Sequence, residues 1–554
     1  MLSDIAANFA ETEKYYDSIV PRHPSSNDQQ NANTINDIVD HLDACHTQRL
    51  EEIESMPRRT LNTVWWPFVQ HGLVQGEHKV TVIDSAHSDF FNVHRAPPPS
   101  SPLSTQPKHG LSILSPEFDG SASWWTQTIG HANPALTLAA ARASGRYGHV
   151  IFPEATHLPA LKLAEKLVKE GPGRGWAARA FFSDNGSTGM EIALKMALRA
   201  FNVRRGAFGR KEELGVLGLK GSYHGDTIGA MDACEESGVF TCEWHNAKGY
   251  WFDPPSVAIR DGEVIISVPA AISSAFLKVK VKSLSWVYNV AARLDSDLAG
   301  VYRAYITRTL KSLEHRNDVP RLAVLVLEPL LMGAGGMIFV DPLFQRVLID
   351  VVRGGGIGLD SESSKEWSGL PVIFDEVFVG LHRLGMESTA PMLGAQPDIS
   401  VNAKTLTGGL VPLAVTLASE SVFRAFLGEG KESALLHGHS YTAHAIGCEV
   451  AGETLRMIEE LKGSEGWKGA MESWGVGKEG EGVWSFWDPG FVKALSCVEK
   501  VQEVMTLGCV LAIKIKDGAG GMFSFCCCVE EIRIDRVVRV WIEQCAKGVW
   551  NTEE

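Results

Sequence analysis

The sequence predicts an α/β fold with a buried sheet, and three short apolar runs carry that prediction. Residues 322–327 are apolar throughout and end at Glu328, while residues 371–377 are interrupted only by Asp375 and its neighbour. A third run covers residues 410–417. Short runs without apolar–polar alternation are typical of strands buried on both faces of a sheet. Because ligands bind at the carboxyl ends of such strands, Asp375 is predicted to face a binding site.

Size and charge restrict the classes of protein that fit. The chain has 554 residues, 45% of them hydrophobic, and a net charge of −14. This length indicates two or more domains. The acidic charge, without a long Lys/Arg cluster, argues against a nucleic-acid partner. No apolar stretch approaches the length of a membrane span. The first residues resemble neither a secretory signal nor a transit peptide.

Cysteine usage argues against a metal or disulfide framework. The ten cysteines are scattered apart from residues 526–528, and no C-x-x-C pair occurs. Neither a zinc site nor a set of disulfides is suggested, so no metal and a reducing compartment are expected.

The remaining elements are predicted from periodicity and breakers. Strands are expected at residues 81–84, 178–183, 214–219 and 510–515. Helices are expected at residues 42–56, 158–170, 190–202, 445–461 and 491–507. Loops or turns are expected at residues 96–109, 333–337 and 462–490, and residues 235–320 give few signals.

Asp375 and Lys404 form the most informative pair in the chain. Lys404 lies between two of the predicted strands, about 30 residues after Asp375. A buried carboxylate and a lysine at this spacing are the minimal set for pyridoxal 5'-phosphate (PLP) chemistry. The lysine forms a Schiff base with the cofactor, and the carboxylate keeps the pyridine nitrogen protonated. The alternative for this pair is a helix-capping carboxylate and a solvated lysine.

Two further segments are candidates for cofactor contacts. Gly186 and Ser187 stand at a turn that leads into a helix, where free backbone N–H groups and the helix dipole favour a phosphate. Capping of the helix by Ser or Thr explains this turn equally well. Tyr223 follows a predicted strand, where its ring could stack on a flat cofactor or pack in the core.

Paired tryptophans mark two other segments. Trp124 and Trp125 stand beside small residues and could belong to the core or to the wall of a pocket for a long apolar substrate. Phe68 closes a Trp-Trp-Pro-Phe segment at residues 65–68, where the proline favours an extended backbone.

Taken together, these motifs resemble the class III aminotransferases. The match rests on residues 375–377, Gly380, residues 398–400, residues 403–404 and residues 407–409. The chain is similar in particular to the 7,8-diaminononanoate synthase branch, which serves biotin synthesis. Within that branch it resembles the aminotransferase half of the fused dethiobiotin synthetase–diaminononanoate aminotransferases of fungi and plants. The resemblance runs from about residue 65 to about residue 520.

The resemblance implies a role for each candidate residue. Lys404 and Asp375 would be catalytic, and the cofactor-binding residues would be Gly186, Ser187, Tyr223, Asp375, Val377, Lys404 and Ser440. Ser440 would reach the phosphate of the neighbouring subunit, because the family works as a homodimer with shared sites. The substrate-binding residues would be Phe68, Trp124, Trp125, Tyr223 and Gly409.

The implied fold is fold type I of the PLP-dependent transferases: a large α/β domain with a mostly parallel sheet and a smaller α+β domain from both chain ends. The expected division is an arm or domain remnant at 1–60, part of the small domain at 61–130, the PLP-binding large domain at 131–430 and the C-terminal small domain at 431–554. The implied reaction converts 8-amino-7-oxononanoate to 7,8-diaminononanoate with S-adenosylmethionine as amino donor. A mitochondrial or cytoplasmic location is expected.

Two departures from the family pattern and two rival functions stay open. No P-loop motif occurs, so dethiobiotin synthetase activity is not expected. After Gly520 the character changes, and none of Arg533, Arg536 and Arg539 matches the family's carboxylate-binding arginine. Residues 522–554 are therefore atypical, and the chain as written is expected to pack them loosely and to use the keto acid poorly. The rivals are an aminotransferase for ornithine or 4-aminobutyrate and a catalytically silent scaffold.

Overall fold

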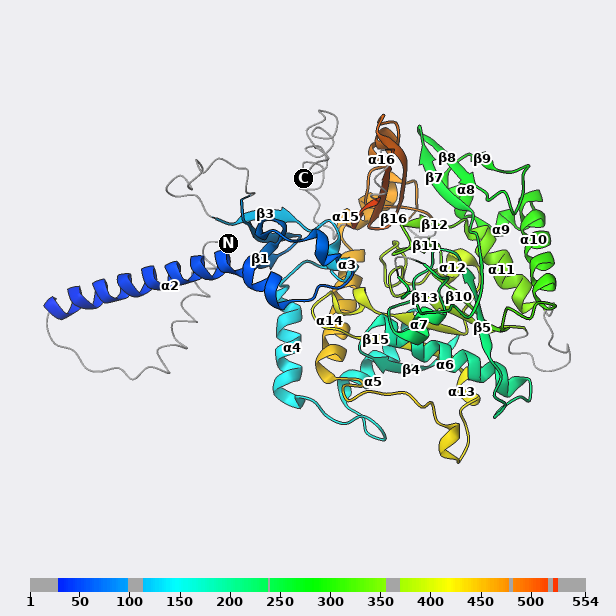
Figure 1. Ribbon diagram of the computed structural model, residues 1–554, viewed down its shortest axis with the longest axis horizontal. Coiled ribbons are helices and arrows are strands. Elements are labelled where there is room, and N and C mark those ends of the chain that lie inside the picture. Colours follow the sequence, from blue (N-terminus) through cyan, green and yellow to red (C-terminus); the bar gives the residue numbers. More distant parts are fainter. Residues whose placement is uncertain are drawn as a thin grey trace. The chain divides into compact units, whose positions relative to one another are not determined.

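The computed structural model describes residues 28–97, 113–237, 240–354, 369–477, 482–516 and 522–526 (Figure 1). It contains two compact units. The first comprises Met1–Ser85 with Phe91–Glu117, and the second Ala86–Phe90 with Phe118–Glu554. Arg533, Arg536, Arg539 and most of the atypical C-terminal segment lie outside the described residues. Among the helices of the described ranges, none combines the length and the apolar character of a membrane crossing.

The first unit consists of one long helix, two short turns and most of a small sheet. Helix α2 (Asp28–Thr63) includes the predicted helix at 42–56, which is confirmed. Two 3-10 turns, η1 (His71–Leu73) and η2 (Glu77–Lys79), precede the sheet. Its three strands lie in the order β1-β2-β3 and are β1 (Thr81–His87), β2 (Phe90–Arg95) and β3 (Ser115–Phe118). The strand predicted at 81–84 is confirmed within β1.

A seven-stranded sheet forms the centre of the second unit. Its order is β4-β15-β14-β13-β10-β5-β6. The strands are β4 (Ala177–Ser183), β15 (Ala414–Ser419), β14 (Ile399–Asn402), β13 (Val372–Asp375), β10 (Arg321–Leu327), β5 (Leu214–Leu219) and β6 (Gly249–Phe252). All neighbours from β14 to β6 are parallel, whereas β15 is antiparallel to both of its partners. The prediction of a mostly parallel, buried sheet is confirmed.

Alternating side chains of the central strands build a core on each face of this sheet. In β10, Val324 and Val326 join the core that includes α6 (Gly186–Arg204). Leu325, on the opposite face, joins the core that includes α11 (Pro342–Arg353). Both faces are therefore covered, which is why the strand reads as a continuous apolar run rather than an alternating one.

A second, antiparallel sheet combines two distant parts of the chain. Its order is β18-β17-β16-β7-β8-β9, and it joins residues 256–281 to the C-terminal residues 501–526. The strands are β7 (Ser256–Arg260), β8 (Glu263–Ser267), β9 (Lys278–Val281), β16 (Val501–Leu507), β17 (Val510–Ile515) and β18 (Met522–Cys526). The predicted strand at 510–515 is confirmed as β17. Only β18 is described from the segment after residue 521.

The helices and short elements that remain surround these sheets. The helices are α3 (Ala122–Trp125), α4 (Pro134–Tyr147), α5 (Leu158–Glu165), α7 (Ile228–Asp232), α8 (Leu284–Tyr288), α9 (Val290–Arg293), α10 (Asp297–Leu313), α12 (Ala390–Leu393), α13 (Glu420–Arg424), α14 (Ala445–Lys462), α15 (Glu465–Ser473) and α16 (Pro489–Ser496). The short elements are the π-helical turn η3 (Lys166–Glu170), strands β11 (Leu331–Met332) and β12 (Ile338–Phe339), and the 3-10 turns η4 (Lys404–Thr407) and η5 (Lys431–Ser433).

Three predicted boundaries near the C-terminal half are wrong. The helix expected at 491–507 is two elements, α16 and β16, because helix formation stops at Ser496 and the following residues pair with β17. The loop expected at 462–490 contains α15, whose Trp467 packs 5.1 Å from the ring of Trp484. The third apolar strand begins only at Ala414, so residues 410–413 lie in the preceding loop.

Candidate active site

A cavity of about 460 Å³ opens at the carboxyl ends of the parallel strands of the second unit. Chain segments that follow β5, β10, β13 and β14 all contribute to it, as expected where parallel strands end at one edge. The lining residues are Trp124, Thr126, Asp184–Ser187, Tyr223–Asp226, Glu328, Ala334, Asp375, Val377, Phe378, Ala403, Lys404, Thr407 and Gly409–Leu413. Eight of the predicted site residues are therefore brought together: Trp124, Gly186, Ser187, Tyr223, Asp375, Val377, Lys404 and Gly409.

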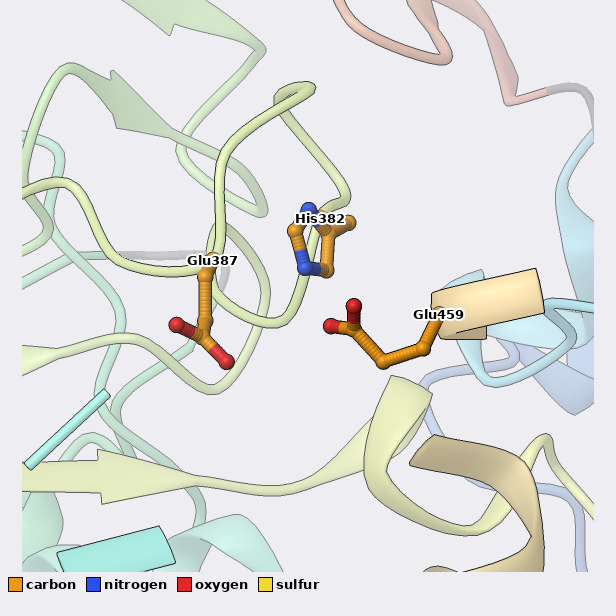
Figure 2. Close-up of side chains that lie close together, drawn as sticks. All are labelled: His382, Glu387 and Glu459. Carbon is orange, nitrogen blue, oxygen red and sulfur yellow. The ribbon is translucent and has the colours of Figure 1, made fainter. Parts of the chain in front are cut away.

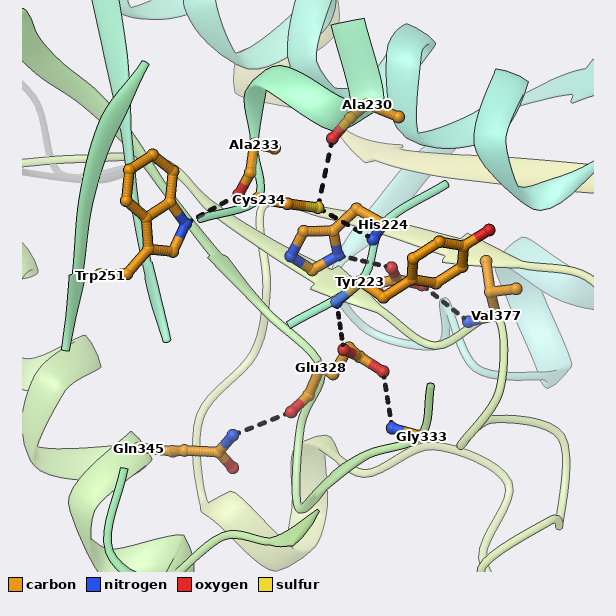
Figure 3. A network of polar contacts seen from close by, with 11 residues as sticks. Tyr223, His224, Ala230, Ala233, Cys234, Trp251, Glu328, Gly333, Gln345 and Val377 are labelled. Atoms are coloured by element: carbon orange, nitrogen blue, oxygen red, sulfur yellow. Dashed lines mark hydrogen bonds and ion pairs between the residues drawn. The ribbon is translucent and has the colours of Figure 1, made fainter. Parts of the chain in front are cut away.

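Asp375 is the last residue of β13 and presents a buried, oriented carboxylate. Its side chain is 5% exposed, and Oδ2 lies 2.7 Å from Nδ1 of the buried His224. The backbone N–H of Val377 donates to Oδ1 at 3.1 Å (Figure 3). Two partners thus fix the carboxylate at the edge of the sheet, with His224 supporting it from behind.

Lys404 follows β14 and begins η4 in a left-handed backbone conformation, with φ of +46°. Its Nζ lies 5.3 Å from the centroid of the Trp125 ring and 5.4 Å from that of Phe378. Aromatic faces at this distance attract an ammonium group. A non-glycine residue in this region is strained, and such strain is common where a side chain must be aimed into a site.

The N-terminus of α6 forms a cradle of backbone groups at the cavity wall. Asn185 caps the helix by accepting from the N–H of Thr188, which leaves the N–H groups of Gly186 and Ser187 at the cavity. A Cβ on Gly186 would stand 2.7 Å from Val377 Cγ1, so only glycine fits there. A helix of 19 residues places partial positive charge at this end, which suits a phosphate.

Tyr223 is half-buried at the exit of β5. Its backbone N–H donates to Glu328 Oε1 at 2.9 Å, and its ring lies 4.9 Å from that of Phe240. Burial, followed by a hydrogen bond with Asp226, raises the pKa of the Tyr223 phenol, so the hydroxyl stays protonated. The ring therefore offers a neutral aromatic face to the cavity.

Glu328 and His224 are site residues to which the sequence analysis gave no role. Glu328 directly follows β10, is 5% exposed and accepts hydrogen bonds from the N–H groups of Tyr223 and Gly333 (Figure 3). Burial raises the pKa of this carboxyl to about 7. The sequence did contain a signal for Glu328, because this residue closes the apolar run of β10, the strand that pairs with the strand of Asp375.

The two tryptophans have different surroundings. Residues 122–125 all have positive φ, between +47° and +64°, so they form a left-handed turn. Trp124 is 57% exposed and lines the cavity. Trp125 is outside the cavity lining and packs its ring edge-on against Phe378, with centroids 5.3 Å apart. Trp124 therefore suits a substrate wall, whereas Trp125 supports the residues around Lys404.

Asp119 stabilises this left-handed turn. Its buried carboxylate accepts hydrogen bonds from Ser121 and Ser123 at 3.0 and 2.8 Å, and it pairs with Nε2 of His131 at 2.9 Å. Burial acts to raise the pKa of Asp119, but these hydrogen bonds outweigh it and lower the pKa.

Besides Trp125, two predicted site residues lie outside the cavity lining. Ser440 is exposed and is not among the residues that line the cavity. Phe68 belongs to the first compact unit, where its side chain is about half exposed.

The raised pKa of Glu328 predicts a pH-dependent stability. Between its usual value near 4.5 and about 7, the unfolded chain ionises Glu328 while the folded chain keeps it protonated. Glu328 therefore contributes about 3 kcal/mol to the free energy of unfolding when the pH is below its unfolded-state pKa near 4.5. This contribution is lost as the pH rises through the folded-state pKa of about 7. Urea unfolding of the native chain and of Glu328→Gln should show their difference changing across this window. The exposed Glu429→Gln is the control, and a pH-independent difference for Glu328→Gln contradicts the assignment.

The family emerges from comparison with known proteins. A model described as aminotransferase class-III matches residues 117–255 and 262–471. The chain belongs to the class III aminotransferases. A relative from Emericella nidulans, named bifunctional dethiobiotin synthetase/adenosylmethionine-8-amino-7-oxononanoate aminotransferase, is 44% identical over 527 residues. That alignment covers 92% of this chain and 64% of the relative.

A plant relative gives the same picture. The Arabidopsis thaliana protein named bifunctional dethiobiotin synthetase/7,8-diamino-pelargonic acid aminotransferase, mitochondrial, is 40% identical over 85% of this chain and 53% of its own length. This class III chain thus spans less than two thirds of either curated relative. The crystal structure of adenosylmethionine-8-amino-7-oxononanoate aminotransferase from Methanocaldococcus jannaschii has a TM-score of 0.58 at 22% identity, covering 83% of this chain and 84% of that one. The fold is fold type I of the PLP-dependent transferases.

Proposed function

We propose that this chain is the aminotransferase that converts 8-amino-7-oxononanoate to 7,8-diaminononanoate, with S-adenosylmethionine as the amino donor. The observation that carries the proposal is the 44% identity to the Emericella nidulans relative over 92% of the chain, which includes every residue of the cavity wall. The rest of the proposal depends on whether the cavity suits PLP.

The donor set of the cavity fits each part of PLP. The N-terminus of α6, with no side chain at Gly186, suits the phosphate. The Asp375 carboxylate, fixed by two partners, suits the protonated pyridine nitrogen. Tyr223 offers an aromatic face, and Lys404 offers the amine. When bound, PLP supplies an electron sink for the carbon that loses its proton.

The chain's own residues would supply the remaining steps. The Lys404 amine holds the cofactor and, once released, accepts the proton from the donor carbon that bears the amino group. Asp375 keeps a negative charge beside the pyridine nitrogen, and His224 keeps that carboxylate in position. The aromatic rings of Trp125 and Phe378, 5.3 and 5.4 Å from Nζ, place apolar surface beside the Lys404 amine. In the second half-reaction Lys404 returns a proton to the acceptor carbon.

An absorbance experiment tests this function. The purified chain, incubated with PLP, should show a visible band that S-adenosylmethionine removes and 8-amino-7-oxononanoate restores, with the diamine detected by mass spectrometry. Ornithine and 4-aminobutyrate are the controls for the rival activities. Removal of the band by either control, and not by S-adenosylmethionine, would assign the chain to a different class III reaction. A chain that never develops the band would fit the silent scaffold.

Trp124→Ala is expected to weaken use of 8-amino-7-oxononanoate more than PLP binding. Trp124 lines the cavity, and an aromatic wall that covers part of an acyl chain contributes about 1–2 kcal/mol, so KM should rise about tenfold. The measurement is steady-state kinetics for the keto acid, together with PLP titration. Trp244→Ala, an exposed tryptophan outside the cavity lining, is the matched control. An unchanged KM in Trp124→Ala would leave Trp124 without a substrate role.

We also propose a homodimer with shared sites and a mitochondrial location. The exposed position of Ser440 leaves it available to a second copy of the chain. The name of the Arabidopsis thaliana relative gives a mitochondrial location for that protein. Light scattering of the purified chain tests the dimer, and microscopy of a tagged full-length gene product tests the compartment.

A further inference from the structure

His382, Glu387 and Glu459 form a compact group apart from the cavity of the active site. One ligand atom from each, an imidazole nitrogen or a carboxylate oxygen, lies within 4.8 Å of the other two. None of the three residues lines the active-site cavity. His382 and Glu387 belong to the turn after β13, and Glu459 belongs to α14. Figure 2 shows the imidazole directed toward both carboxylates.

The backbone of the turn holds two of these groups opposite each other. The N–H of Leu381 donates to the carbonyl of Glu387, and the N–H of His382 donates to that of Met386, both at 2.9 Å. These two bonds form a hairpin that places His382 and Glu387 on facing arms. Their juxtaposition is therefore a property of the folded backbone rather than of two mobile side chains.

His382 carries the second observation. Only 9% of the residue is exposed, and its buried Nδ1 has no hydrogen-bond partner among the described residues. The ring contacts the edge of Trp467, with centroids 5.7 Å apart. The imidazole faces the two carboxylates (Figure 2) but makes no hydrogen bond to a described residue, although buried polar side chains are nearly always hydrogen-bonded or bound to an ion. This arrangement points to a ligand between the three side chains.

We propose that His382, Glu387 and Glu459 bind a divalent transition-metal ion such as Zn²⁺. One imidazole and two carboxylates are a ligand set that this ion accepts, with water completing the coordination. Ligands at about 2.0–2.2 Å from one ion lie no more than about 4.4 Å apart. The observed 4.8 Å limit needs only a small movement, which the exposed Glu459 side chain provides.

Lys462 is the internal competitor for this ion. Its Nζ lies 3.0 and 3.1 Å from the two carboxylate oxygens of Glu459, three residues earlier on α14. An incoming cation has to share or displace that ammonium group. Removal of Lys462 should therefore strengthen metal binding, an effect that a purely structural role for the three ligands does not predict.

A bound ion would connect the turn to α14 next to a residue that supports the active site. Arg383 follows His382 and donates to the carbonyl oxygens of Trp125 and Gln127, each at 2.9 Å. It also donates to Thr405 Oγ1 at 3.2 Å, beside Lys404. The ion would thus stabilise the segment that holds the left-handed tryptophan turn. This inference does not depend on the identity of the amino donor or acceptor.

Titration calorimetry with Zn²⁺ on the full, PLP-loaded chain tests the proposal. We expect one ion per chain, and Glu459→Gln should weaken its Kd by at least about tenfold. Lys462→Ala should tighten the Kd, and Glu460→Gln, an exposed neighbour on α14 that pairs with Arg456, should leave it unchanged. Glu459 and Lys462 are solvent-facing, so these variants should fold, and Zn²⁺ should raise Tm only where it binds.

Co²⁺ replaces Zn²⁺ in a second measurement that separates this site from the cysteines. Binding to His382 and the two carboxylates should give weak visible bands without the near-ultraviolet charge-transfer band of a thiolate ligand. A spectrum dominated by thiolate charge transfer, or the same Kd for the native chain, Glu459→Gln and Lys462→Ala, would overturn the proposal. Failure to bind either ion would overturn it as well.

Discussion

Lys404→Ala is expected to abolish transamination, with turnover lower by at least about 10⁴-fold. The side chain is expected both to hold the cofactor and to move the proton between carbon atoms. Among the residues that line the cavity, Lys404 is the only lysine, so no neighbouring amine replaces it. Steady-state assays with 8-amino-7-oxononanoate measure the loss, and circular dichroism confirms that the variant folds.

Covalent trapping identifies the lysine directly. Borohydride reduction of the PLP-loaded chain, followed by peptide mass spectrometry, should place the label on Lys404. Lys220→Ala is the matched control, because Lys220 pairs with Asp253 outside the active-site cavity and its removal should leave labelling intact. A label on any other lysine would remove Lys404 from the mechanism.

Asp375→Asn should retain PLP and lower turnover by about 10²- to 10³-fold. The amide keeps the size of the carboxylate and one acceptor for His224, but it carries no charge to stabilise a protonated pyridine nitrogen. Because Asp375 is only 5% exposed, water does not compensate for the lost charge. Cofactor content by absorbance and kcat by single-turnover kinetics separate binding from catalysis.

Asp253→Asn is the control for this change, since Asp253 is an exposed carboxylate whose partner is Lys220. It should leave both cofactor content and kcat close to those of the native chain. Near-normal turnover in Asp375→Asn would assign the pyridine nitrogen to another group. Loss of PLP in Asp375→Asn would make the carboxylate a binding residue rather than a catalytic one.

The amino-acid sequence alone was enough to predict the central strands and the edge of the sheet at which the site lies. Residues 214–219 are β5 as predicted, and the bounds of β10 and β13 lie within two residues of their predicted bounds. Because these strands are covered on both faces, their sequences are uninterrupted apolar runs, which can be recognised within a short window. The same local signals placed Asp375 at the end of a strand and Lys404 between two strands, where the structure has them.

Apolar spacing was not enough to predict the structure where a single stretch of sequence contains a helix followed by a strand. Residues 491–507 have apolar spacing that fits a helix, yet the second half pairs with β17 as β16. The other partner of this strand, β7, lies more than 200 residues earlier in the chain. Periodicity within a short window carries no information about such partners.

Only the tertiary structure decided what surrounds the catalytic pair. The Tyr223–Glu328 hydrogen bond joins residues 105 positions apart, and the contact of His224 with Asp375 spans 151 positions. The two adjacent tryptophans diverge because a left-handed turn, anchored by Asp119, directs Trp124 to the cavity and Trp125 to Phe378. A sequence records which residue types can do chemistry, whereas their pKa values, orientations and partners follow from packing that brings distant segments together.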